Sequence, residues 1–211
     1  MGDAGERTSC PFCRRGDLEI VLTETDHFYV LVDNAPLTEG HLLIVPHEHA
    51  PCFGAVPAAY DEELAALKAR VSAFLERAYR SVCFFEHGVF RQTVYHAHLH
   101  AIPLGADTLS NDLSVDAQDA GGMLVREQTD IRAWFAAIGH YFFVEQTSHG
   151  AAPSIAALFP PNETVYFGVL ARLVSAAGRH HPFQSQAARR LTGAPRMRSV
   201  AEAWARYSQS L

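Results

Sequence analysis

The chain has 211 residues and a formal net charge of −6, with 48% hydrophobic and 19% charged residues. This length supports one hydrophobic core, or one core with an appendage. The acidic balance argues against broad binding to nucleic acids or anionic membranes, although it leaves room for a local cationic pocket. Neither a membrane span nor a signal peptide is predicted. We therefore expect a cytoplasmic protein, in which the four cysteines are thiols or metal ligands and not disulfides.

The first half of the chain predicts an α+β domain at residues 10–104, preceded by a disordered polar tail at residues 1–9. A helix is expected at 57–81, where apolar side chains recur every three or four residues between charges. Short apolar segments predict five strands, at residues 18–23, 28–33, 41–46, 82–86 and 92–103. Their close spacing favours antiparallel pairing. The expected core is a five-stranded, mostly antiparallel sheet with one long helix packed on it.

The second half, residues 105–211, predicts a C-terminal α/β extension, either a small second lobe or an elaboration packed on the first domain. Residues 105–122 are polar and loop-like. The remaining expected elements are a short helix at 130–139, a strand at 140–146, a strand at 165–169 or a partly helical segment at 162–177, and helices at 185–192 and 200–209. Gly193, Ala194 and Pro195 are expected to separate the last two helices.

Three histidines alternate with small or apolar residues in the fifth expected strand: His96, His98 and His100. Alternation with period two is a strand pattern, so all three imidazoles are expected on one face. They could share one anionic ligand, hold a metal, or divide these two tasks. A solvated polar face is the simpler interpretation. The apolar neighbours Leu99 and Ile102 instead indicate a core strand, where polar rings require partners.

A Cys-x-x-Cys pair, Cys10 and Cys13, lies near the start of the chain. Two such thiolates can supply half of a tetrahedral zinc site, or they can form a redox pair. A thioredoxin-like redox motif lies where a strand passes into a helix. No helix is expected directly after Cys13, so zinc binding is the better interpretation.

Three blocks of this sequence resemble the histidine triad superfamily. Residues 92–103, Gln-Thr-Val-Tyr-His-Ala-His-Leu-His-Ala-Ile-Pro, resemble its signature. Residues 33–49 resemble its second block, with an Asp before a Pro-containing turn, then Gly-His, then an apolar strand ending in Pro-x-x-His. Cys10-Pro-Phe-Cys13 is similar to the start of the zinc-containing branch. The resemblance covers roughly residues 10–104 and implies a nucleotide-binding catalytic domain.

The activity implied by this resemblance is nucleotidyl hydrolysis or transfer at the α-phosphate. The expected substrate is a small nucleotide, either a dinucleoside polyphosphate or a nucleoside monophosphate conjugate of the phosphoramidate type. By match to the signature, His98 is the nucleophile that forms a covalent nucleotidyl-histidine. Its other ring nitrogen must donate to a fixed acceptor, and a backbone carbonyl near His100 is the expected one. The side chains of His100 and Gln92 are expected to donate to phosphate oxygens, beside the hydroxyl of Thr93.

The nucleoside is expected to contact residues upstream of the triad. The resemblance places Asp33 at the ribose, where a carboxylate can accept from both hydroxyls. The alternative role for Asp33 is to cap the turn at residues 34–36. Phe12 and Leu31 match positions that line the base slot, although simple core packing explains them almost as well. His41 is expected to make a supporting hydrogen bond.

The resemblance also implies a structural Zn²⁺ with a closed set of four ligands: Cys10, Cys13, His49 and His96. His47 and Cys52 lie close enough to His49 in the sequence to be rival ligands. Such a site would tie the N-terminal segment to the segment that carries His98.

The chain departs from the family pattern at residues 86–91. This loop is short, Arg91 stands where Gly is common, and the family's usual Asn is replaced near Glu86 or His87. The sequence therefore does not fix the identity of the leaving group. Arg91 could contact a distal phosphate, or it could be a solvated charge at the surface. Two other functions compete: a catalytically weak nucleotide-binding module, and a metalloenzyme with its metal on the three triad histidines. The resemblance also allows a homodimer.

Overall fold

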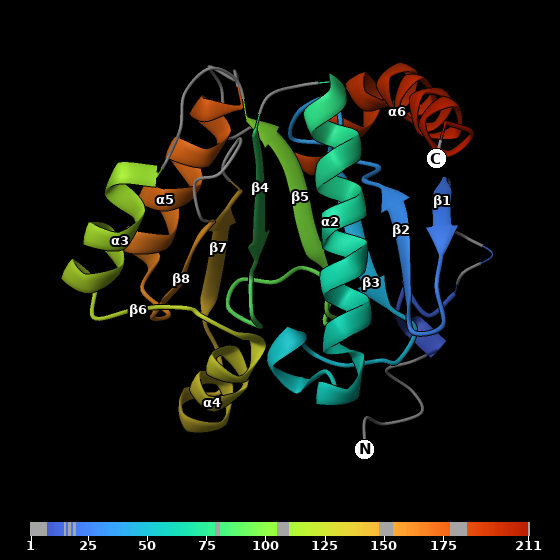
Figure 1. Cartoon of the computed structure of the whole chain (residues 1–211). Coiled ribbons are helices and arrows are strands. Elements are labelled where there is room, and N and C mark those ends of the chain that lie inside the picture. The colour runs from blue at the N-terminus through green and yellow to red at the C-terminus, as the bar shows by residue number, and fades with distance from the viewer. Residues whose placement is uncertain are drawn as a thin grey trace.

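One antiparallel sheet joins both halves of the chain in the computed structural model (Figure 1). The structure describes residues 8–14, 16, 18, 20–78, 81–104, 110–147, 154–177 and 185–210, and at 110–112 only the backbone. Within these residues the sheet has eight strands in the order β1-β2-β3-β5-β4-β7-β8-β6. The expected disordered tail lies outside the described residues, except for a helical turn at Thr8 and Ser9.

The elements have the following bounds. The strands are β1 (Val21–Glu24), β2 (Phe28–Val32), β3 (Leu42–Pro46), β4 (Ser81–Glu86), β5 (Leu99–Leu104), β6 (Met123–Leu124), β7 (Phe142–Gln146) and β8 (Ile155–Phe159). The α-helices are α2 (Asp61–Ala78), α3 (Ser110–Asp119), α4 (Gln128–Ile138), α5 (Glu163–Ala176) and α6 (Gln186–Ser208). Two 3₁₀ turns, η2 (Phe53–Ala55) and η3 (Ala58–Tyr60), precede α2.

Helix α2 covers one face of the sheet, across its middle strands (Figure 1). Its buried side chains lie three or four residues apart, and they pack with Phe84 and Leu99 from the sheet. Three acidic residues, 61–63, occupy its first turn, where negative charge is favourable. Helix α6 packs beside α2 through Trp204 and Tyr207. No described helix has the length and apolar character needed to cross a membrane.

The opposite face carries one row of side chains across the sheet. The pairing register aligns Leu31, Leu43, His100, Phe85 and Val144 on neighbouring strands. Helices α3 and α5 cover the row at its β7–β8 end, and the N-terminal segment approaches the β2–β3 end. His100 therefore lies in the middle of a row that is covered at both ends.

The expectation of one strand over residues 92–103 is wrong for its first part. Strand β5 begins at Leu99, and residues 92–98 form an irregular loop. The backbone N–H of Ala97 donates to the carbonyl of Ala50 at 2.6 Å, and the side-chain amide of Gln92 binds carbonyls of the loop. Only His100 of the three histidines is in the strand, so they do not share one strand face.

The second half differs from its prediction at α3, β6, β8 and α6. Residues 110–119 form α3 where a loop was expected, and β6 and β8 lie where no strand was expected. Residues 163–176 form α5, which settles the open choice there in favour of a helix. Helix α6 continues through Pro195. Gly193 fits against Pro36, where a Cβ atom would come within 2.6 Å of Pro36 Cδ, and this packing outweighs the local tendency to break.

Candidate active site

A cavity of about 440 Å³ opens on the face of the sheet that carries His100. It is lined by His98 and His100, by Asp33 from the turn after β2, and by side chains of α5 and α6. Of the residues that the sequence proposed for a nucleotide site, Phe12, Leu31 and Thr93 also line it. The cavity wall thus contains residues from 11 to 190 and is formed by both halves of the chain.

The ring of His98 is held in one tautomer. Its Nδ1 lies 2.6 Å from the carbonyl oxygen of His96, and a carbonyl can only accept, so Nδ1 carries the proton. The acceptor is not near His100, as the resemblance suggested, but at His96. His98 is 6% exposed, and burial lowers the pKa of its imidazole. A neutral ring with Nδ1 protonated has its lone pair on Nε2, which makes Nε2 the available nucleophile.

His41 sets the tautomer of His100 through two hydrogen bonds in series. The backbone N–H of Leu37 donates to His41 Nδ1 at 3.0 Å, so the proton of a neutral His41 is on Nε2. His41 Nε2 then donates to His100 Nδ1 at 2.9 Å. The proton of His100 is therefore on Nε2, a buried atom with no partner among the described residues. His41 thus makes the supporting hydrogen bond expected of it, and His100, which lines the cavity, keeps an unused donor.

Gln92 points into the protein and does not line the cavity. Its Oε1 accepts from the backbone N–H of Val89 at 2.9 Å. Its Nε2 lies 3.1, 2.5 and 3.0 Å from the carbonyls of Pro51, Val94 and His96. These carbonyls take up both hydrogens of the amide, so the expected phosphate contact is not what this structure provides. Gln92 instead holds the carbonyl that orients His98.

Asp33 serves the turn and also lines the cavity. Its Oδ1 accepts from the backbone N–H of Ala35 at 2.6 Å, which is the capping role named as the alternative. Its Oδ2 lies 3.6 Å from His41 Nδ1. Phe12 approaches the loop at residues 92–98 closely, and its ring centroid lies 5.2 Å from that of His98 and 5.7 Å from that of His96.

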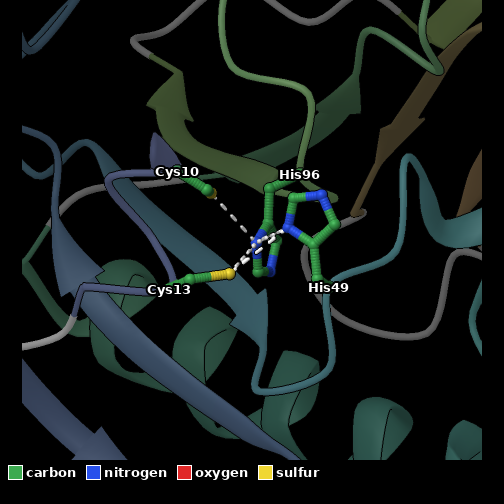
Figure 2. Close-up of side chains that lie close together, drawn as sticks. All are labelled: Cys10, Cys13, His49 and His96. Carbon is green, nitrogen blue, oxygen red and sulfur yellow. Dashed lines mark hydrogen bonds between the residues drawn. The ribbon is translucent and has the colours of Figure 1, made fainter. Parts of the chain in front are cut away.

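The four residues proposed as zinc ligands converge (Figure 2). Their potential ligand atoms all lie within 4.8 Å of one another. His49 Nδ1 is 3.2 Å from His96 Nδ1 and 3.3 Å from Cys13 Sγ, and Cys10 Sγ is 3.4 Å from His96 Nδ1. Tetrahedral zinc with ordinary bond lengths separates its ligand atoms by about 3.3–3.8 Å, so this set fits the ion.

The tautomer of His96 also fits metal binding. Its Nε2 lies 2.9 Å from the carbonyl of Pro46 and must donate to it, which leaves Nδ1 without a proton and facing the cysteines. The rival ligands are placed elsewhere. His47 Nε2 donates to the carbonyl of Thr25 at 3.1 Å. Cys52 lies in the hydrophobic core and outside the cluster of four, and there burial, with the nearby Glu86 carboxylate, raises its pKa to about 12.

Sequence reasoning missed the contribution of the second half to the cavity. Tyr166 and Phe167 on α5, and Gln186, Arg189 and Arg190 on α6, line it beside the histidines. Arg91, considered for a distal phosphate, forms an ion pair with Glu163 of α5 and lies over the ring of Phe167. No motif marks these residues, because their positions depend on how α5 and α6 pack on the sheet.

The comparisons with known proteins place this site in a family. The model of the family described as "Protein similar to CwfJ C-terminal" matches residues 4–115. The chain is 31% identical over 98 residues to the adenosine 5′-monophosphoramidase hnt1 of Schizosaccharomyces pombe, covering 45% of this chain and 74% of that protein. It is 30% identical over 84 residues to the CWF19-like protein 1 homolog of Drosophila melanogaster, covering 38% of this chain.

This chain spans only 15% of the length of the Drosophila protein. A solved structure of a hypothetical protein from Leishmania major is 27% identical, with a TM-score of 0.41, and covers 54% of this chain and 94% of that one. The family model, which matches more than half of this chain, and the fission yeast relative show that the chain belongs to the family of proteins similar to the CwfJ C-terminus, within the histidine triad superfamily.

Replacement of Gln92 tests its assignment as the anchor of the loop. Gln92→Glu keeps the shape but removes the donors for three carbonyls, of which that of His96 is buried, and it adds a charge at a buried position. We expect the free energy of unfolding in urea to fall by at least about 2 kcal/mol. Gln118→Glu, the same change at an exposed position of α3, should cost less than about 0.5 kcal/mol. Equal effects of the two substitutions would contradict the assignment.

Proposed function

We propose that the protein cleaves or transfers a nucleoside monophosphate unit at the α-phosphate of a small nucleotide, through a covalent intermediate on His98. The observation that carries the proposal is the 2.6 Å hydrogen bond from His98 Nδ1 to the His96 carbonyl, at the wall of a cavity that Asp33 also lines. This bond leaves Nε2 as a preformed nucleophile. The fission yeast relative, an adenosine 5′-monophosphoramidase by name, is consistent with this class of reaction.

The reaction proceeds in two displacements. The Nε2 lone pair of His98 attacks the α-phosphorus, the bond from phosphorus to the leaving group breaks, and the leaving group departs with the electron pair and takes up a proton from solvent. An acceptor such as water then attacks phosphorus, and the P–N bond breaks to restore Nε2. The Nε2–H of His100 donates to a phosphoryl oxygen that gains charge.

The remaining residues bind the nucleoside and support the site. Asp33 accepts from the ribose hydroxyls with the carboxylate oxygen that the turn does not use, while Phe12 and Leu31 flank the base. Thr93 offers its hydroxyl to the phosphate. Gln92 acts indirectly, because its amide holds the His96 carbonyl at 3.0 Å. The zinc completes the proposal: Cys10, Cys13, His49 and His96 hold it, and the ion supplies a structural cross-link and no chemistry.

One observation favours the alternative of a nucleotide-binding module with weak catalysis. The amide of Gln92 is taken up by backbone carbonyls, so the phosphate has one neutral donor fewer than the resemblance implied. A measurement of product formation distinguishes the two functions, because a binding module binds nucleotides but releases no product from them.

The nucleophile assignment is tested with His98→Ala. We expect kcat to fall by about 10³-fold or more on adenosine or guanosine phosphoramidates and dinucleoside tetraphosphates, whichever the wild-type protein turns over. Affinity for the nucleoside monophosphate, measured by calorimetry, should stay within about threefold because Asp33 and the base slot remain. The matched control is His27→Ala, which removes a half-exposed histidine paired with Glu63 far along the chain from the triad. A His98→Ala protein with full activity would show that the nucleophile is another group.

The zinc proposal predicts one zinc ion per purified chain by elemental mass spectrometry. Cys13→Ser should remove most of the zinc and lower Tm by about 10 °C, since a structural metal contributes several kcal/mol to folding. Cys83→Ala removes a buried cysteine of the core outside the cluster and should keep the zinc. A metal-free wild-type protein whose Tm does not respond to added zinc or chelator would refute the site.

A further inference from the structure

A fourth histidine, His87, lies against the triad. Its ring centroid is 5.3 Å from that of His100, in an edge-on contact, and 6.4 Å from that of His98. His87 lines the same cavity. It belongs to the short segment after β4 in which this chain departs from its family's pattern, so the resemblance assigns it no role.

Tyr166 of α5 is hydrogen bonded to this histidine. Its hydroxyl oxygen lies 3.1 Å from His87 Nδ1. Tyr166 is 5% exposed, and its ring is held edge-on by Phe142 at 5.0 Å and by Phe90 at 5.7 Å. The tyrosine is thus fixed by aromatic packing, and its hydroxyl is directed at one ring nitrogen of His87.

The direction of this hydrogen bond follows from the donors available. A phenol that donates to Nδ1 satisfies its own hydrogen and leaves the proton of His87 on Nε2. In the opposite arrangement Nδ1–H donates to the phenol oxygen, and the hydroxyl hydrogen then has no acceptor recorded among the described residues. Burial raises the pKa of Tyr166 to about 12, so the phenol keeps its proton. Donation by Tyr166 is therefore the favoured arrangement.

His87 is also neutral. Burial, with a smaller contribution from the nearby His98, lowers the pKa of its imidazole to about 3. A neutral ring with Nε2–H is a hydrogen-bond donor and neither a base nor a cation. The two histidines beside it are fixed in the same manner, His98 by a carbonyl and His100 by His41. Three rings that line one cavity are each set to a single tautomer by a hydrogen-bond partner from the protein.

We propose that His87 is a further catalytic residue, which donates a hydrogen bond from Nε2 to the phosphoryl group under attack, and that Tyr166 of α5 is its positioning residue. The inference rests on the proposed function, because it requires a phosphoryl group at His98. His87 keeps its proton throughout, so no proton transfer to the leaving group is involved. In this proposal the second half of the chain contributes to catalysis, because it supplies Tyr166.

The tautomer is tested first, without substrate. Nitrogen-15 NMR of the wild-type protein should show His87 protonated on Nε2 with an unprotonated Nδ1. Tyr166→Phe should shift His87 toward a mixture of tautomers, whereas Tyr207→Phe, a buried tyrosine between α6 and α2, should leave it unchanged. Protonation of His87 on Nδ1 in the wild-type protein would overturn the inference, whatever the outcome for the proposed function.

The catalytic role is tested on the substrate that the wild-type protein turns over fastest. His87→Phe keeps a ring but has no donor, and it should lower kcat by about 100-fold with KM within about threefold, as for removal of one transition-state donor. His87→Gln places an amide N–H near the position of Nε2 and should recover at least about a tenth of the wild-type kcat. Tyr166→Phe should lower kcat by about tenfold.

The outcomes separate the two levels of the proposal. An unchanged kcat in His87→Phe, or equal losses in His87→Phe and His87→Gln, overturns the role of His87 while the nucleophile His98 stands. A wild-type protein that turns over no substrate overturns the proposed function itself, and the role of His87 with it.

Discussion

The carbonyl oxygen of His96 is the point on which the site depends. It accepts from His98 Nδ1 at 2.6 Å and from the Gln92 amide at 3.0 Å. The same residue turns its side chain the other way, toward Cys10, Cys13 and His49. A regular strand would point the carbonyl of His96 at a neighbouring strand and not at the ring two residues later. The irregular loop at 92–98 is thus the structural condition for a histidine with a free Nε2.

The site is a set of neutral rings whose protons are placed by their surroundings. Hydrogen bonds to backbone groups fix the tautomers of His98 and His41. His41 in turn fixes the tautomer of His100 through a 2.9 Å hydrogen bond. Burial lowers the pKa of His87, His98 and His100 and favours their neutral form, because a desolvated imidazolium is costly. Preorganised donors of this kind lose little by reorganisation when charge develops at phosphorus. The second half of the chain joins this arrangement at one defined point, the contact between Tyr166 and His87.

Much of the fold and part of the site could be predicted from the sequence, for local reasons. Short apolar segments located β2, β3 and β4, which are buried on both faces, and the 3.6-residue pattern located α2, which buries one face. The four residues of the Cys and His cluster, Cys10, Cys13, His49 and His96, were predicted from their match to family motifs along the sequence. The loop at 92–98 was mistaken for a strand, because its hydrogen bonds come from Gln92 and Ala50, which no periodicity reveals. The continuation of α6 through Pro195 and the hydrogen bond between Tyr166 and His87 were missed for a similar reason, as both depend on contacts with distant residues.

The central claim is that His98 Nε2 becomes covalently bonded to the α-phosphorus. The most direct measurement is the intact mass of the wild-type protein, quenched within milliseconds of mixing with substrate, followed by peptide mapping at neutral or alkaline pH, where a phosphorus–nitrogen bond survives. We expect a transient mass increase of one nucleoside monophosphate residue, located on His98 and absent from His98→Ala. Rapid product formation with no adduct at any time, or an adduct on another residue, would contradict it.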